Sequence, residues 1–207
     1  MEELRKKAEE IFERNCAKRL DEVHCRGVAY VAEKIARRAG MNADKAYVFG
    51  LLHDVGKEPH SGWGHIMIGY EKMTAEGMPE VARICLTHSF PVKSVLSDMR
   101  DEEFYDFVAG YIEKVEYDDY DLLVQLADFM ACADGVVPIE WRVCDILLRH
   151  QATPNSQAML RRIYELKQYF AEKCGVSDLY ELFDDEFSKV DYHKIPGDFK
   201  FEKEGTK

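Results

Sequence analysis

The sequence predicts an all-α fold, with a single helical bundle followed by a C-terminal helical extension. Apolar residues recur at spacings of three and four along most of the chain, and no stretch of useful length shows the alternation of a strand. The 207 residues, 46% apolar and 32% charged, suit one globular domain with a substantial core. We place an N-terminal helix at residues 1–17, the bundle at 18–150, the helical extension at 151–187 and a flexible tail at 188–207.

Composition and charge exclude several classes of protein. The net charge of −11 opposes binding along nucleic-acid phosphates or an anionic bilayer. Six cysteines are scattered without a CxxC pair, which favours reduced core thiols over a zinc knuckle or a disulfide framework. The first fifteen residues are too charged for a signal peptide, and no apolar run approaches the roughly 20 residues of a membrane span. We therefore expect a cytoplasmic protein without nucleic-acid or membrane partners, and its oligomeric state stays open.

The first two helices lead to a candidate metal ligand. Residues 2–15 have a narrow apolar stripe that indicates a surface helix packed on the bundle. The next helix, which Asp21 can cap, has apolar residues at helical spacing from Val28 onward and ends at Gly40. Four residues before Val28, His24 lies on the same buried face. His24 is either a core histidine with a satisfied hydrogen bond or a metal ligand.

The stretch AYVFGLLHDVGKEPH, residues 46–60, contains the strongest chemical signal. Its apolar run ends in His53 and Asp54, and a buried carboxylate without a partner is costly. A divalent metal ion compensates both groups, because imidazole nitrogen and carboxylate oxygen are common ligands. Neighbouring helical residues point roughly 100° apart, so the two reach one ion only from a helix end that faces a cleft. We expect this helix to begin near Asn42 and to end at Gly56 and Pro59.

The residues after this helix are expected to surround the site. Loop 58–64 should line its mouth, where Trp63 either stacks on a base or sugar or covers an edge of the core. His65 begins a helix at 65–76, and His88 follows another at 78–87.

Four further helices are predicted, at residues 101–115, 121–133, 138–149 and 155–174, followed by a short one at 177–187. Helix 121–133 is apolar on nearly all sides with Asp128 in its middle, so Asp128 requires a metal ion or an arginine as partner. In helix 138–149, Glu140 and Arg142 either form a structural ion pair that holds the Asp128 helix or reach a phosphate.

With these residues in place, the chain resembles the HD superfamily of metal-dependent phosphohydrolases over roughly residues 18–150. The family pattern of a histidine, an adjacent His-Asp pair and a distant aspartate maps onto His24, His53 with Asp54, and Asp128. The sequence HDVGK also matches the common His-Asp-x-Gly-Lys form, and the resemblance implies that the four residues bind a divalent metal ion.

The positions of His65 and His88 are similar to those in symmetrical diadenosine-tetraphosphate hydrolases, and 138–149 resembles a segment of small stand-alone HDIG-type proteins. The first similarity implies a second ion, with Asp54 bridging the two. The alternative is a single ion, with His65 and His88 forming hydrogen bonds to the substrate. The nitrogen and oxygen ligands suit Fe, Mn, Co, Ni, Mg or Zn alike.

The function implied by the resemblance is hydrolysis of a nucleotide or related small phosphoester by metal-activated water, with Asp54 and Lys57 as catalytic residues. Lys57, Trp63 and Arg142 are the predicted substrate-binding residues, although Lys57 also fits a solvent-exposed lysine at a helix C-terminus. Two alternatives remain. One is a di-iron oxygenase of the HD fold, and the other is a nucleotide-binding regulator without turnover.

Overall fold

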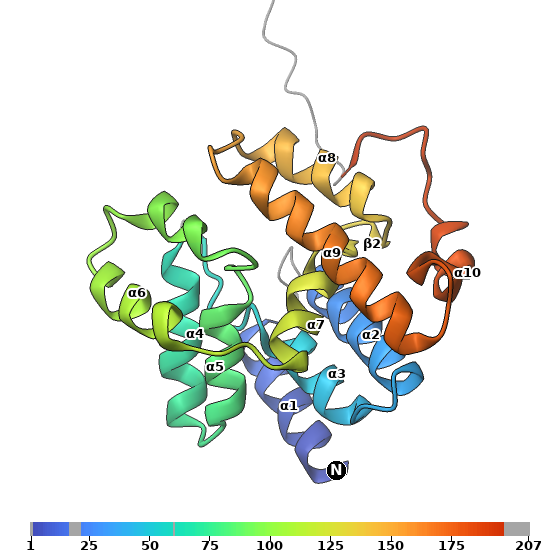
Figure 1. Ribbon diagram of the computed structural model, residues 1–207. Helices are drawn as coiled ribbons and strands as arrows, with labels where there is room; N and C mark the ends of the chain where they lie inside the picture. Colours follow the sequence, from blue (N-terminus) through green and yellow to red (C-terminus); the bar gives the residue numbers. More distant parts are fainter. Residues whose placement is uncertain (1, 17–21, 60, 197–207) are drawn as a thin grey trace, which may run out of the picture.

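The computed structural model describes residues 2–16, 22–59 and 61–196, and these residues confirm the all-α fold (Figure 1). The first α-helices are α1 (Glu2–Asn15), α2 (Glu22–Arg38), α3 (Ala43–Leu52), α4 (Gly64–Ala75), α5 (Pro79–Thr87), α6 (Tyr105–Lys114) and α7 (Asp119–Asp128). The later ones are α8 (Ile139–Arg149), α9 (Ser156–Cys174) and α10 (Asp184–Phe187). Two 3-10 helices, η1 (Lys93–Met99) and η2 (Leu179–Leu182), and two short strands, β1 (Ala131–Cys132) and β2 (Gly135–Val136), complete the described elements.

The main core forms where α2 packs against α3 and α7. Helix α1 covers α3 with its buried stripe of Ala8, Ile11 and Phe12, as its amphipathic pattern predicts. Helix α9 crosses α7 on the other side, and Phe170 and Phe183 are buried in the same core. The C-terminal helices therefore share the hydrophobic core of the bundle, while the residue limits that we assigned to each part remain predictions.

A second apolar cluster lies between α4, α5, η1 and α6, the green elements on the left of Figure 1. Its fully buried members include Ile66, Leu86, Phe90 and Ile112. Helix α5 joins the two cores, because Ile84 belongs to the first and Leu86 to the second. The two apolar cores therefore meet at α5, and the predicted metal ligands lie where they meet.

The structure corrects several predicted boundaries. The helix predicted at 101–115 begins only at Tyr105, and the preceding 3-10 helix Lys93–Met99 was not predicted. The helix predicted at 121–133 is α7, which ends at Asp128, so this aspartate is its last residue and not its middle. The antiparallel β1–β2 hairpin follows, with Asp134 in its turn. Strands of two residues are too short to show alternation, which is why the sequence pattern missed them.

The cysteines and the C-terminal helices can also be compared with their predictions. Five of the cysteines are buried, as expected for core thiols, whereas Cys144 is exposed. The segment predicted as one short helix at 177–187 divides into η2 and α10. The predicted cap Asp21 lies outside the described residues. Among the helices that the structure describes, none is long and apolar enough to cross a membrane.

Candidate metal centre

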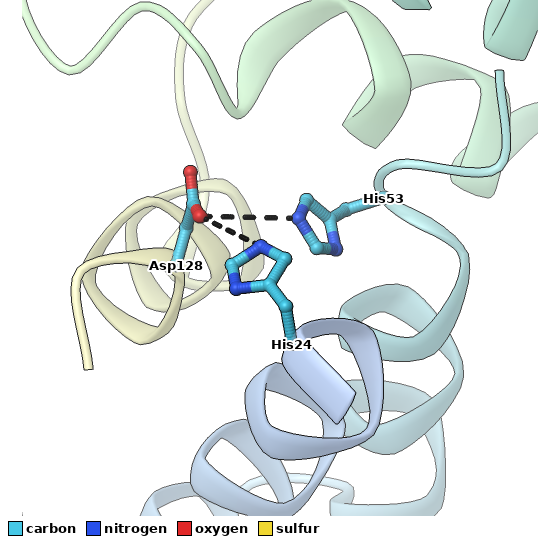
Figure 2. A group of neighbouring side chains, drawn as sticks. All are labelled: His24, His53 and Asp128. Carbon is cyan, nitrogen blue, oxygen red and sulfur yellow. Dashed lines mark ion pairs between the residues drawn. The ribbon is translucent and has the colours of Figure 1, made fainter. Parts of the chain in front are cut away.

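Three of the predicted ligands meet from three different elements (Figure 2). His24 comes from the first turn of α2, His53 directly follows α3, and Asp128 ends α7. Their ring and carboxylate groups face one another, with His24 Nε2 at 3.1 Å and His53 Nε2 at 4.0 Å from the same oxygen, Asp128 Oδ1. These three side chains form one group with the spacing needed to hold a metal ion.

A second group lies next to the first. His65, in the first turn of α4, and His88, directly after α5, place their Nε2 atoms 3.3 Å apart. These two atoms are 3.6 and 3.4 Å from Asp54 Oδ1. The structure therefore brings together all six residues that the sequence predicted as ligands.

Asp54 lies between the two groups and directs one oxygen to each. Its Oδ1 faces His65 and His88, whereas its Oδ2 is 3.8 Å from His24 Nε2 and 3.5 Å from His53 Nε2. A carboxylate that divides its oxygens in this way has the arrangement of a ligand bridging two ions.

Each histidine ring is held by a backbone carbonyl at its other nitrogen. Carbonyl oxygens only accept hydrogen bonds, so Nδ1 carries the proton in the neutral ring and Nε2 keeps its lone pair. The distances from Nδ1 to the carbonyl oxygen are 3.0 Å for His24 to Ala131, 2.7 Å for His53 to Gly50, 2.6 Å for His65 to Gly62 and 3.1 Å for His88 to Ile84. All four lone pairs therefore point toward the carboxylates.

These contacts fit a divalent metal ion. Lone pairs on Nε2 and on carboxylate oxygens repel each other, and burial makes an uncompensated group of this kind costly. Among the described residues, Nε2 of His24 and Nε2 of His53 have no hydrogen-bond partner, although both rings are buried. A cation between these atoms removes the repulsion and satisfies both nitrogens, and the nitrogen and oxygen donor set is one that divalent metals use.

Nearby cations keep the two carboxylates ionised. Burial opposes ionisation of Asp54, but the Lys57 ammonium, 2.9 Å from Oδ2, outweighs it and holds the pKa of Asp54 well below the usual range. Burial also opposes ionisation of Asp128, yet the Arg142 guanidinium, 3.3 Å from Oδ1, favours the charged form, and the pKa of Asp128 lies well below the usual range too. Both carboxylates are therefore available as charged ligands at neutral pH.

The histidines respond to the same surroundings. Burial lowers the pKa of His53 to about 4 and also lowers the pKa of His65. For His88, burial acts in the same direction, but the contact with Asp54 outweighs it and raises the pKa. The Asp54 charge thus favours a positive charge at the second group, where a metal ion would lie.

Gly56 lets α4 approach the ligand turn. A Cβ at this position would lie 2.1 Å from His65 O and 2.2 Å from Gly69 N, both in the backbone of α4. We interpreted Gly56 as a residue that ends the preceding helix, but its φ is not positive and α3 has already ended at Leu52. The glycine is needed instead because two backbone segments pack directly on each other.

A cavity of about 710 Å³ opens over the centre. Lys57, His65, His88 and Asp128 line it, and Trp63 lies in its wall with its ring stacked on Phe90 at a centroid distance of 5.7 Å. Lys57 and Trp63 are therefore placed where a substrate would bind, although binding itself remains a prediction.

Arg142 lies beside the centre but does not line the cavity. Its guanidinium is buried and contacts Asp128 Oδ1 at 3.3 Å and Asp145 Oδ2 at 2.5 Å, so its predicted contact with substrate is untested. Glu140, which we considered as its partner, instead accepts hydrogen bonds from Tyr164 and Tyr180.

Sequence reasoning did not identify Asp145 and Arg149 as part of this region. Asp145 accepts hydrogen bonds from Arg142 and from Arg149, and Arg149 lines the cavity. The spacing of three and four residues along one helix was a signal for such a row of charges. Nothing local indicated that the row faces the metal centre.

A protein-family model described as the HD domain matches residues 22–131, more than half of the chain and including all six predicted ligands. No curated protein and no solved structure shows significant similarity to the chain. Because the domain match specifies no substrate, the finer similarity to diadenosine-tetraphosphate hydrolases stays a prediction. The matching domain and the geometry of its His-Asp residues show that the chain belongs to the HD domain superfamily of metal-dependent phosphohydrolases.

Proposed function

We propose that the protein hydrolyses a nucleotide or a related small phosphoester in a metal-dependent reaction. The observation that carries the proposal is the buried Asp54 carboxylate, which faces one pair of histidines with each oxygen, beside a cavity that His65, His88 and Asp128 line. Divalent ions at such a site, when bound, supply an activated water and stabilise charge on phosphoryl oxygens. The division of oxygens favours two ions over one.

The protein's own side chains prepare this site for an anionic substrate. The Nδ1 hydrogen bonds to carbonyls fix the histidine rings, so their Nε2 lone pairs need no reorientation during the reaction. Lys57 lies at the edge of the cavity beside Asp54, and its pKa is raised chiefly by the Asp54 charge. A cationic Lys57 can then stabilise charge on the phosphoryl group that is transferred.

The rest of the cavity suits the organic part of a nucleotide. Trp63, Val95, Ile146 and Met159 give it an apolar lining above the polar floor. A flat, partly apolar base can bury its faces against such side chains while its phosphates remain at the charged end. This combination supports a nucleotide as the substrate class.

The test is phosphate release from a panel of nucleotides by the full chain, loaded in turn with each candidate metal. We expect release by the wild type and a loss of at least about 10³-fold in Asp54→Asn, because the bridging charge is gone. Asp106→Asn on the exposed face of α6 is the matched control and should be fully active. Nucleotide binding without phosphate release would favour a regulator, and O₂ consumption with a non-phosphorylated substrate would favour an oxygenase. Either result would contradict the proposal.

A further inference from the structure

One wall of the cavity comes from outside the matched HD domain. The end of α8, the connection to α9 and the first turn of α9 supply Ile146, Arg149, Gln151, Asn155 and Met159. The family match ends at residue 131, so these residues lie outside the matched HD domain. The match therefore says nothing about the features of the cavity that they determine.

This wall is held in place across the cavity. Asn155 Nδ2 donates to Ser97 Oγ at 2.9 Å and to Asp98 Oδ1 at 2.7 Å, which joins the start of α9 to η1. The turn before α9 is also ordered by its own hydrogen bonds, with Thr153 N donating to Ser156 Oγ at 2.9 Å. In Figure 1 the orange α8–α9 connection extends toward the green η1 segment. These hydrogen bonds therefore fix the position of the wall relative to the rest of the cavity.

Arg149 is fixed in this wall by a bidentate ion pair. Its Nε and Nη2 donate to the two oxygens of Asp145 at 3.0 and 2.8 Å. Asp145 is buried and also accepts from Arg142, which contacts Asp128 of the metal centre. A row of alternating charges thus connects the cavity wall with a predicted metal ligand.

The ion pair with Asp145 leaves part of the Arg149 guanidinium available to bind a ligand. Within the described part of the chain, Nη1 makes no hydrogen bond, and 37% of the side chain is exposed. A guanidinium holds its N–H donors in one rigid plane, in a geometry that matches phosphate oxygens. The ion pair with Asp145 already fixes the orientation of that plane, and the donors on Nη1 remain for a phosphate. Little further ordering is needed when an anion binds.

The charges around the cavity favour an anion beside Arg149. Among the described residues, two acidic side chains other than Asp128 line it, but Asp98 accepts from Asn155 and Glu58 accepts from Lys72 at 3.0 Å. Lys57 lies beside the metal centre, and Arg149 lies on the other wall, at the end of α8. The cavity therefore has two separate cationic positions, and transfer of a single phosphate group requires only one of them.

We propose that Arg149 binds a second phosphate group of the substrate, one that is not transferred. This inference rests on the proposed function and narrows its substrate class to oligophosphates, with nucleoside diphosphates and triphosphates preferred over monophosphates. Arg149 is then a specificity-determining residue supplied by the C-terminal helices, and the HD domain supplies the reacting centre.

The test compares two non-hydrolysable probes that differ by one phosphonate group. Binding of methylenediphosphonate and of methylphosphonate to the full-length, Mn²⁺-loaded protein is measured by calorimetry. In Arg149→Gln we expect methylenediphosphonate to bind about 10- to 100-fold more weakly, the usual effect of losing charged hydrogen bonds. Methylphosphonate should bind within about twofold of its wild-type affinity, because it does not reach Arg149.

Arg162→Gln is the matched control. Arg162 lies on α9 in an ion pair of 3.0 Å with Glu165, and its side chain is 35% exposed, but it does not line the cavity. This variant should bind both probes like the wild type. Arg149→Lys keeps a cation beside Asp145, so this variant should fold even if Arg149→Gln does not. We expect it to lose about fivefold for methylenediphosphonate only, since lysine lacks the planar guanidinium.

Equal affinities of wild type and Arg149→Gln for methylenediphosphonate would overturn the inference, as would equal losses for both probes. Failure of the wild type to bind methylenediphosphonate more tightly than methylphosphonate would also overturn it. Because binding of these probes requires no turnover, the result is separate from the proposed function. A wild type that shows the expected binding but releases no phosphate from any nucleotide would support the anion site and contradict hydrolysis.

Discussion

The contact at Gly56 gives a prediction whose magnitude follows from the packing. In Gly56→Ala the new methyl group would lie 2.1 Å from His65 O and 2.2 Å from Gly69 N. Both neighbours are backbone atoms of α4, so no flexible side chain can move away to make room. The turn that follows α3 and the helix α4 would have to separate by about 1 Å to relieve the overlap.

The expected cost lies at the upper end for overpacking, about 3 kcal/mol in the free energy of unfolding. For a chain of this size, that corresponds to a decrease in Tm of about 6 to 12 °C. The separation would also carry His65 away from Asp54 Oδ1, to which its Nε2 is now 3.6 Å. We therefore expect the second metal position to weaken before the first.

Thermal melting by circular dichroism and metal analysis of the same preparation measure both effects. The control is Gly64→Ala, at the start of α4, where an added Cβ meets nothing within 4 Å. It should melt at the wild-type temperature or slightly above, because alanine favours the helix. A Gly56→Ala protein with wild-type Tm and wild-type metal content would refute the argument.

Three further predictions concern the centre itself. Lys57→Ala should lower kcat and kcat/KM together by about 10² to 10³ with unchanged metal content, whereas an unchanged kcat would exclude a role in the transition state. Asp128→Ala should lose the ion at His24 and His53 together with phosphohydrolase activity, and full metal content in this variant would contradict the assignment. Removal of metal with a chelator should lower the Tm by at least about 5 °C, because ions that bind only the folded state stabilise it, and an unchanged Tm would argue against a resident metal.

Much of the candidate site was accessible from local patterns in the sequence. The helical spacing that places Val28 on the buried face of α2 also places His24 there, and the end of an apolar run marks His53 and Asp54. The structure brings these residues together with Asp128, although metal binding by them is still a prediction. The helical patterns placed these residues on buried faces and at the end of an apolar run, whereas their grouping around one metal ion was implied by the family resemblance.

The rest of the site depends on contacts between distant segments. Asn155 meets Asp98 across 57 positions of the chain, and no local pattern indicates that these segments form one cavity. Gly56 was interpreted as a helix stop because its neighbour α4 could not be placed from the sequence. The β1–β2 hairpin escaped notice because its strands have only two residues each. In each case the missing information is how the elements pack together.

The number of metal ions per chain tests the central claim most directly. The claim is that Asp54 bridges two ions, one with His24 and His53 and one with His65 and His88. Elemental analysis of metal-replete protein should find two ions in the wild type, one in His88→Ala and almost none in Asp54→Asn. One ion in the wild type that persists in His88→Ala, or a wild-type metal content retained by Asp54→Asn, would contradict the claim.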